Sequence, residues 1–222
     1  MFLLRRMAAA LHATVVAGCA GMMAFCAFEM LIESHGLAGH RLAFTSMLAG
    51  VGFFAVLDQI LPHAHLALAG AEMPAVKRKA ALLIGAMTLH NIPEGFAVAA
   101  AFADSASLGW LVTLCIAFQD VPEGLVVAAP VACQGVPARR CFLWGVWSGL
   151  VEAAAAIGGF VFLRTVCSVT PAALGFSAGT MAYVTFFELL PDAFRTENRR
   201  RVLAAFVAGL AIAYGLAVLA GR

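Results

Sequence analysis

Charged residues are scarce in this chain of 222 residues. It has 14 Lys and Arg and 12 Asp and Glu, together 12% of the sequence, and a formal net charge of +2. Soluble domains average about 25% charged and about 45–50% apolar residues, whereas 63% of this chain is hydrophobic and its mean hydropathy is +0.95. This composition argues against a water-soluble globular protein, a disordered chain and a nucleic-acid-binding protein.

The six cysteines include no Cys-x-x-Cys pair, the spacing that is typical of thiolate metal sites. Most of them lie in or beside apolar runs, so we predict that they pack as small apolar side chains in helices. We therefore expect neither a disulfide nor a thiolate metal cluster.

Long apolar runs dominate the chain, and a helix needs roughly 20 mostly apolar residues to cross a bilayer. The connections between the runs are short, which leaves no room for a soluble domain. The prediction is an all-α fold, in which residues 1–222 form one polytopic transmembrane helical bundle with seven spans. The predicted spans are Met7–Glu33, Leu42–Gly70, Ala80–Ala103, Leu108–Ala132, Cys141–Leu163, Ala172–Leu190 and Val202–Gly221.

The basic residues predict how the bundle lies in the membrane. If the spans alternate in direction, 11 of the 14 bases fall on the side of the N-terminus. Cytoplasmic loops carry the excess of Lys and Arg, so we place the N-terminus in the cytoplasm and the C-terminus outside. The apolar run after Arg5 and Arg6 resembles a signal peptide, but it continues past Cys19 to Glu33, and we expect an uncleaved first helix. The three bases on the opposite side are Arg41, Arg164 and Arg222.

No basic residue lies inside a predicted span, but six acidic residues do, besides Glu29 and Glu33 at the outer end of the first span. An ionisable group in lipid is costly unless it is protonated or paired with a cation. Protonated carboxyl groups bonding between helices could explain one or two of the six, whereas a cation pathway explains all of them. The six are Asp58, Glu94, Asp120, Glu123, Glu152 and Glu188.

The third and fourth predicted spans carry one motif twice, at an offset of 29 residues. The third reads His-Asn-Ile-Pro-Glu-Gly from His90, and the fourth reads Gln-Asp-Val-Pro-Glu-Gly from Gln119. Residues four apart share a helix face, so His90 faces the same way as Glu94, and Gln119 the same way as Glu123. Each proline removes one backbone N–H and leaves the carbonyl four residues earlier, such as that of Phe118, without its helical partner.

Imidazole, carboxylate and carboxamide groups therefore converge near the middle of the membrane. Such ligands suit Zn²⁺, Fe²⁺, Mn²⁺, Co²⁺ or Cd²⁺, and the lack of Cys and Met among them disfavours Cu(I). The neutral carboxamides reduce the ligand charge and weaken binding, which suits a transporter that must release its ion. The candidate metal ligands in the motifs are His90, Asn91, Glu94, Gln119, Asp120 and Glu123.

Further polar residues could extend a cation path toward both faces. Glu29 and Glu33 lie one turn apart at the outer end of the first span, where an ordinary wet rim is the alternative explanation. Asp58, His63, His65 and Glu188 lie toward the predicted cytoplasmic side.

These motifs resemble the signature of the ZIP (Zrt-, Irt-like) family of divalent-metal transporters, and the Gln-Asp start of the second motif resembles its prokaryotic GufA-like branch. The resemblance implies zinc as the favoured cargo and a two-metal site. One position would use His90, Glu94, Gln119 and Glu123, and the other Asn91, Asp120 and Glu152, with Glu94 and Glu123 bridging. The family usually has eight spans with its first motif in the fourth, so this chain resembles a member that lacks the first helix.

The expected function is passage of a divalent transition metal through the membrane into the cytoplasm. We expect no cofactor, no nucleic acid, a bacterial inner membrane as the location and a homodimer as one possible assembly. An intramembrane metal-dependent enzyme is an alternative, although the chain has no His-Glu-x-x-His motif and no nucleophile elbow. A proton or cation channel is the other alternative.

Overall fold

Helices form every regular element in the ranges that the structure describes. The computed structural model describes residues 2–68, 75–132, 136–196 and 198–222, and the side chains of residues 10–60, 85, 88–121, 124, 136–195 and 198–222. The elements are α1 (Phe2–Leu68), α2 (Ala75–Asp104), α3 (Ala106–Ala132), α4 (Ala138–Thr165), the 3₁₀ turn η1 (Cys167–Val169), α5 (Thr170–Tyr183), the π-helical turn η2 (Val184–Leu189), α6 (Leu190–Thr196) and α7 (Arg199–Leu219).

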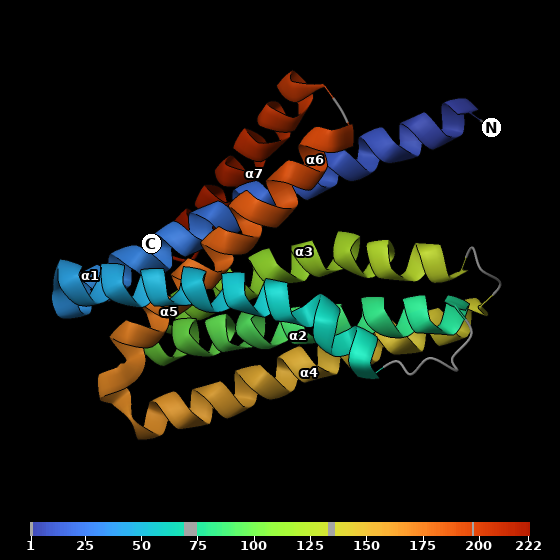
Figure 1. Cartoon of the computed structure of the whole chain (residues 1–222). Helices are drawn as coiled ribbons and strands as arrows, with labels where there is room; N and C mark the ends of the chain where they lie inside the picture. The colour runs from blue at the N-terminus through green and yellow to red at the C-terminus, as the bar shows by residue number, and fades with distance from the viewer. Residues whose placement is uncertain (1, 69–74, 133–135, 197) are drawn as a thin grey trace.

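Helix α1 is broken at Gly39, whose φ of 79° and ψ of 169° are not helical. A straight helix of its 67 residues would be about 100 Å long, more than three times the thickness of the bilayer core. Glycine adopts this positive φ without a steric penalty. The two arms of α1 run in opposite directions (Figure 1) and contain the first and second predicted spans.

The helices divide into two groups by their packing. Helix α1 packs most extensively on α5 and then on α7, whereas α2 packs mainly on α4 and then on α3. We call α1, α5, η2, α6 and α7 the first helix group, and α2, α3 and α4 the second. Contacts of α1 with α3 and of α2 with α5 join the groups along a surface that we call the seam. Figure 1 shows α2, α3 and α4 running alongside one another beneath the first arm of α1 and α7.

Bulky apolar side chains cover much of the outside of the molecule. Phe142 is 69% exposed, Ile157 68% and Leu219 86%, and soluble monomers rarely expose large contiguous apolar patches. Four described stretches are long and apolar enough to cross a membrane, namely Ala10–Ile60, Ala138–Thr165, Cys167–Arg195 and Arg199–Leu219. The structure is therefore an all-α membrane bundle.

The described helices thus include four stretches that are long and apolar enough to span a membrane, whereas seven spans are predicted from the sequence. The stretch Ala10–Ile60 contains two predicted spans joined through Gly39. Parts of the third and fourth predicted spans lie outside the described side chains, and α3 contributes only the shorter apolar stretch Ala106–Val121.

The exposed basic residues gather at the ends of helices. Arg139 and Arg140 open α4, and Arg199–Arg201 open α7. In Figure 1 these helix starts lie toward the same end of the molecule as the N-terminus, and the C-terminus lies toward the opposite end, as does the end of α4 with Arg164. Most of the exposed bases named here therefore lie toward one end of the bundle. Which side of the membrane that end faces stays a prediction.

Candidate metal centre

Three carboxylates from three helices meet inside the second helix group. Glu94 comes from α2, Asp120 from α3 and Glu152 from α4, and each offers an oxygen within 4.8 Å of the other two. Glu94 is only 4% exposed, and Asp120 hydrogen-bonds Glu152. Carboxylates this close in apolar surroundings repel each other unless a proton or a cation neutralises them. The carboxylate triad, as we call these three residues, therefore has the ligand atoms and the spacing to hold a cation.

The second motif orients the first through Gln119. Its side chain is fully buried, and its Nε2 donates a hydrogen bond to Glu94 Oε1 at 2.7 Å. This bond joins α3 to α2 at the triad and limits the rotation of the Glu94 carboxylate. Hydrogen bonds of this kind position metal ligands and tune their strength.

Asn91 is held beside the same cluster by a residue that sequence reasoning missed. Its Nδ2 donates to Ser148 Oγ at 3.2 Å, and both side chains are buried. Ser148 lies one turn before Glu152 on α4, a spacing that puts the two on one helix face. The four-residue spacing between Ser148 and Glu152 is the feature of the sequence from which Ser148 could have been predicted. Asn91 Oδ1 accepts no hydrogen bond from the part of the chain that the structure describes, so this carbonyl oxygen can serve as a ligand.

His90 faces Glu188 across the seam. The distance from His90 Nε2 to Glu188 Oε2 is 2.9 Å, and the imidazole packs edge-on against Phe54 with ring centroids 4.9 Å apart. Glu188 belongs to η2, and such single π-helical turns occur frequently at functional sites. Sequence spacing did not reveal this contact, and the depth of Glu188 in the membrane stays a prediction.

Comparison with known proteins identifies the family of the chain. The family model described as ZIP Zinc transporter matches residues 62–221. The chain belongs to the ZIP family. Its relatives include the putative zinc transporter At3g08650 of Arabidopsis thaliana, 33% identical over 206 residues, which are 90% of this chain and 33% of that protein.

Two bacterial relatives match more of their own length. Zinc transporter GufA of Myxococcus xanthus is 36% identical over 179 residues, covering 79% of this ZIP chain and 70% of the relative. Zinc transporter ZupT of Corynebacterium efficiens is 29% identical over 215 residues, covering 86% and 80%. The ZIP chain thus spans a third of the Arabidopsis protein but most of the bacterial ones. All three are described as transporters and none as an enzyme, so the enzyme alternative is set aside.

The glycine of the first motif has a packing role in this ZIP chain. A Cβ at Gly95 would lie 2.2 Å from the backbone oxygen of Glu152 and 3.0 Å from the Ala155 Cβ, so only a glycine lets α4 approach α2 this closely. That approach brings Glu152 to Glu94. A Cβ at Gly124, the same position in the second motif, would meet no described atom within 4 Å.

The carbonyl that Pro122 deprives of its helical partner has another one. Cys19 Sγ, on the first arm of α1, donates to Phe118 O at 3.6 Å. The sequence predicted that this carbonyl is freed, and the structure adds that its partner comes from across the seam. Cys19, Cys26, Cys115 and Cys141 are buried and have free thiols, whereas the free Cys167 is exposed.

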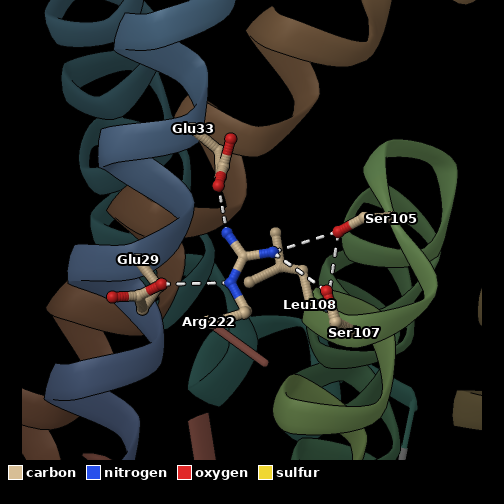
Figure 2. Close-up of polar contacts among 6 residues, drawn as sticks. All are labelled: Glu29, Glu33, Ser105, Ser107, Leu108 and Arg222. Atoms are coloured by element: carbon tan, nitrogen blue, oxygen red, sulfur yellow. Dashed lines mark hydrogen bonds and ion pairs between the residues drawn. The ribbon is translucent and has the colours of Figure 1, made fainter. Parts of the chain in front are cut away.

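The residues predicted along the cation path have varied surroundings. Asp58 Oδ2 accepts a hydrogen bond from the Tyr183 hydroxyl at 3.2 Å, a partner that sequence spacing does not reveal. Glu29 and Glu33 both contact the guanidinium of Arg222, and Figure 2 shows them reaching it from one face of α1. The side chains of His63, His65 and Glu123 lie outside the described residues, so their roles stay predictions.

Proposed function

We propose that this ZIP chain carries zinc or a chemically similar divalent transition-metal ion across a membrane, with the ion held midway by the carboxylate triad. The observation that carries this proposal is the meeting of Glu94, Asp120 and Glu152 inside an apolar helical bundle. A carboxylate set of this kind is expensive to bury without a cation, and oxygen ligands suit divalent ions. The zinc transporters among its relatives support zinc as the cargo.

We further propose two adjacent ion positions. The first would use His90, Glu94, Gln119 and Glu123, the second Asn91, Asp120 and Glu152, and the two glutamates of the motifs would bridge them. Two observations support this. Gln119 contacts Glu94 directly, which puts the second motif beside the proposed bridging carboxylate. Asn91 is buried on the same helix with its carbonyl oxygen available.

We propose that the cargo enters the cytoplasm, through seven spans of a bacterial inner membrane with the N-terminus inside. The gathering of exposed bases toward the N-terminal end of the bundle supports this orientation. We also propose a homodimer, which crosslinking in native membranes would test. Iron, manganese, cobalt and cadmium are the competing cargoes.

The experiment that tests the function is zinc uptake into sealed proteoliposomes that contain an entrapped fluorescent zinc indicator. We expect Glu94→Gln, Asp120→Asn and Glu152→Gln each to reduce uptake toward the level of protein-free vesicles. Asp192→Asn removes an exposed carboxylate on α6 and is the matched control, which should keep most of the uptake. Wild-type uptake equal to that of empty vesicles, or triad variants as active as wild type, would refute the proposal. Repeating the assay with Mn²⁺, Fe²⁺, Co²⁺ and Cd²⁺ ranks the cargoes.

A further inference from the structure

A single guanidinium ties together three segments at the end of the bundle that is farthest from the N-terminus (Figures 1 and 2). Arg222 Nε donates to Glu29 Oε2 at 3.2 Å, and Nη2 pairs with Glu33, one turn further along α1. Nη1 donates to Ser105 Oγ at 3.0 Å and to Ser107 Oγ at 3.5 Å. The guanidinium therefore uses all three of its nitrogens, which is the geometry in which arginine binds most firmly.

The guanidinium of this cluster is mostly buried, although the cluster borders an open pocket. The Arg222 side chain is only 12% exposed, so its ion pairs are screened less than those of an ordinary surface arginine. The pocket has a volume of about 470 Å³ and is lined by Glu29, Glu33, Asp104, Ser105, Ser107, Gly221 and Arg222. Three carboxylates and one guanidinium thus face a water-accessible space.

The contacts of Arg222 cross the seam. Glu29 and Glu33 belong to the first helix group, and Arg222 follows its last helix. Ser105 lies between α2 and α3, and Ser107 lies in the first turn of α3, so both serines belong to the second group. One turn deeper along α1, the fully buried Cys26 hydrogen-bonds Cys115 of α3. The two helix groups are therefore in contact directly beneath Arg222. If they separate at this end, the hydrogen bonds from Arg222 Nη1 to Ser105 and Ser107 must break.

The positive charge of Arg222 also affects ions that enter the pocket. The guanidinium occupies the oxygens of Glu29 and Glu33 that would otherwise attract a cation, and it repels cations at close range. Without it, the pocket would keep three carboxylates and would concentrate cations more strongly.

We propose that Arg222 is a latch, which holds the two helix groups together at this end and opposes the entry of cations. Its effect on uptake depends on the transport function proposed above, whereas its effect on the seam does not. Release of Nη1 from Ser105 and Ser107 opens the pocket toward Cys26, and neutralising the guanidinium favours the open form.

Thiol labelling tests the latch without requiring transport. Wild type and Arg222→Gln are placed in nanodiscs, where both faces are accessible, and are treated with a charged maleimide. The labelling rate of each cysteine is followed by peptide mass spectrometry. We expect Cys26 to react about fivefold faster or more in Arg222→Gln, a factor typical of coupling between sites. The exposed Cys167 should react at an unchanged rate, and the buried Cys141 at the far end of α4 should stay protected.

Three further variants separate a latch from general damage. Arg164→Gln removes an exposed arginine from the same end of the molecule, and Cys26 should then react as in wild type. Glu33→Gln should accelerate labelling as Arg222→Gln does. The exchanged pair Glu33→Arg with Arg222→Glu should restore slow labelling, which a loss of folding could not do.

Uptake provides the second readout. At zinc concentrations below saturation, we expect Arg222→Gln to take up zinc severalfold faster than wild type. An unchanged Cys26 rate in both Arg222→Gln and Glu33→Gln overturns the latch, whatever the uptake. If Arg222→Gln labels faster at Cys26 but takes up zinc more slowly than wild type, the proposal that Arg222 opposes cation entry is overturned. Failure of the triad variants to affect uptake would overturn the transport function alone.

Discussion

The imidazole of His90 and the carboxylate of Glu188 lie 2.9 Å apart and join the two helix groups at the level of the first motif. His90 comes from α2 and Glu188 from η2, so this hydrogen bond crosses the seam. Arg222 joins the same groups at one end of the bundle and Cys19 joins them through Phe118. Each of these contacts can be tested singly.

The coupling between His90 and Glu188 can be measured with a double-mutant cycle. We expect His90→Ala and Glu188→Ala to destabilise the protein less than additively, with a coupling energy of roughly 0.5–2 kcal/mol, as for polar contacts in membrane bundles. Thermal unfolding of the purified protein in detergent, without added metal, gives the four values. A coupling indistinguishable from zero would show that the contact does not stabilise the bundle.

The zinc affinity of the purified protein tests the carboxylate triad without a transport assay. Asp120→Asn and Glu152→Gln keep the side-chain size but remove an anionic ligand, so we expect zinc affinity to fall by at least about tenfold. Competition with a fluorescent chelator measures this change. Ser148→Ala should reduce zinc affinity less, because Ser148 positions Asn91 through a hydrogen bond and its replacement removes no anionic ligand. Equal affinity in wild type and both carboxamide variants would mean that zinc binds elsewhere.

The two motif glycines should respond differently to the same substitution. Gly95→Ala forces a methyl group against the backbone of α4 and should cost about 1–3 kcal/mol, the usual penalty of overpacking. Gly124→Ala meets no described atom within 4 Å and should be neutral or stabilising by up to ~1 kcal/mol, because alanine favours helix. Unfolding temperatures of both variants provide the measurement. Equal losses would contradict the close approach at Gly95.

Cys19 should stabilise the bundle through its hydrogen bond to Phe118 as well as through packing. Cys19→Ala leaves the Phe118 carbonyl without its partner across the seam and should cost about 1 kcal/mol. Cys19→Ser keeps a donor and should be close to wild type. Cys167→Ala, at an exposed position, is the control for the loss of a thiol. If serine and alanine at position 19 have the same unfolding temperature, the hydrogen bond is unimportant.

The repeated motif pointed to Glu94 and Asp120 and the family resemblance to Glu152, and the structure brings these three side chains together. Residues four apart on one helix, such as Asn91 to Gly95 or Ser148 to Glu152, are ordered by helix geometry alone. Contacts between helices depend on how the helices pack, which the sequence does not encode in a simple spacing. The Tyr183 bond to Asp58 and the Arg222 bonds to Glu29 are contacts of this kind.

The position of Glu188 shows a second limit. Its spacing along the chain gave no indication that it would reach His90 of the first motif. The π-helical turn η2 adds an extra residue to the turn and changes which side chains face the seam. No periodicity in the sequence marks such a turn, so the contact of Glu188 with His90 could not be predicted from spacing.

All members of the carboxylate triad, together with Asn91 and Gln119, come from the second helix group. Under the proposed function, we therefore expect the choice of ion and the speed of its passage to depend on largely different residues. Changes within the second group alter the shape and charge of the ion's binding shell, and so which metal is preferred. Changes along the seam that spare His90, which belongs both to the proposed binding shell and to the seam, should leave that shell intact and alter how often an ion reaches it. Selectivity and turnover can on this basis be engineered independently.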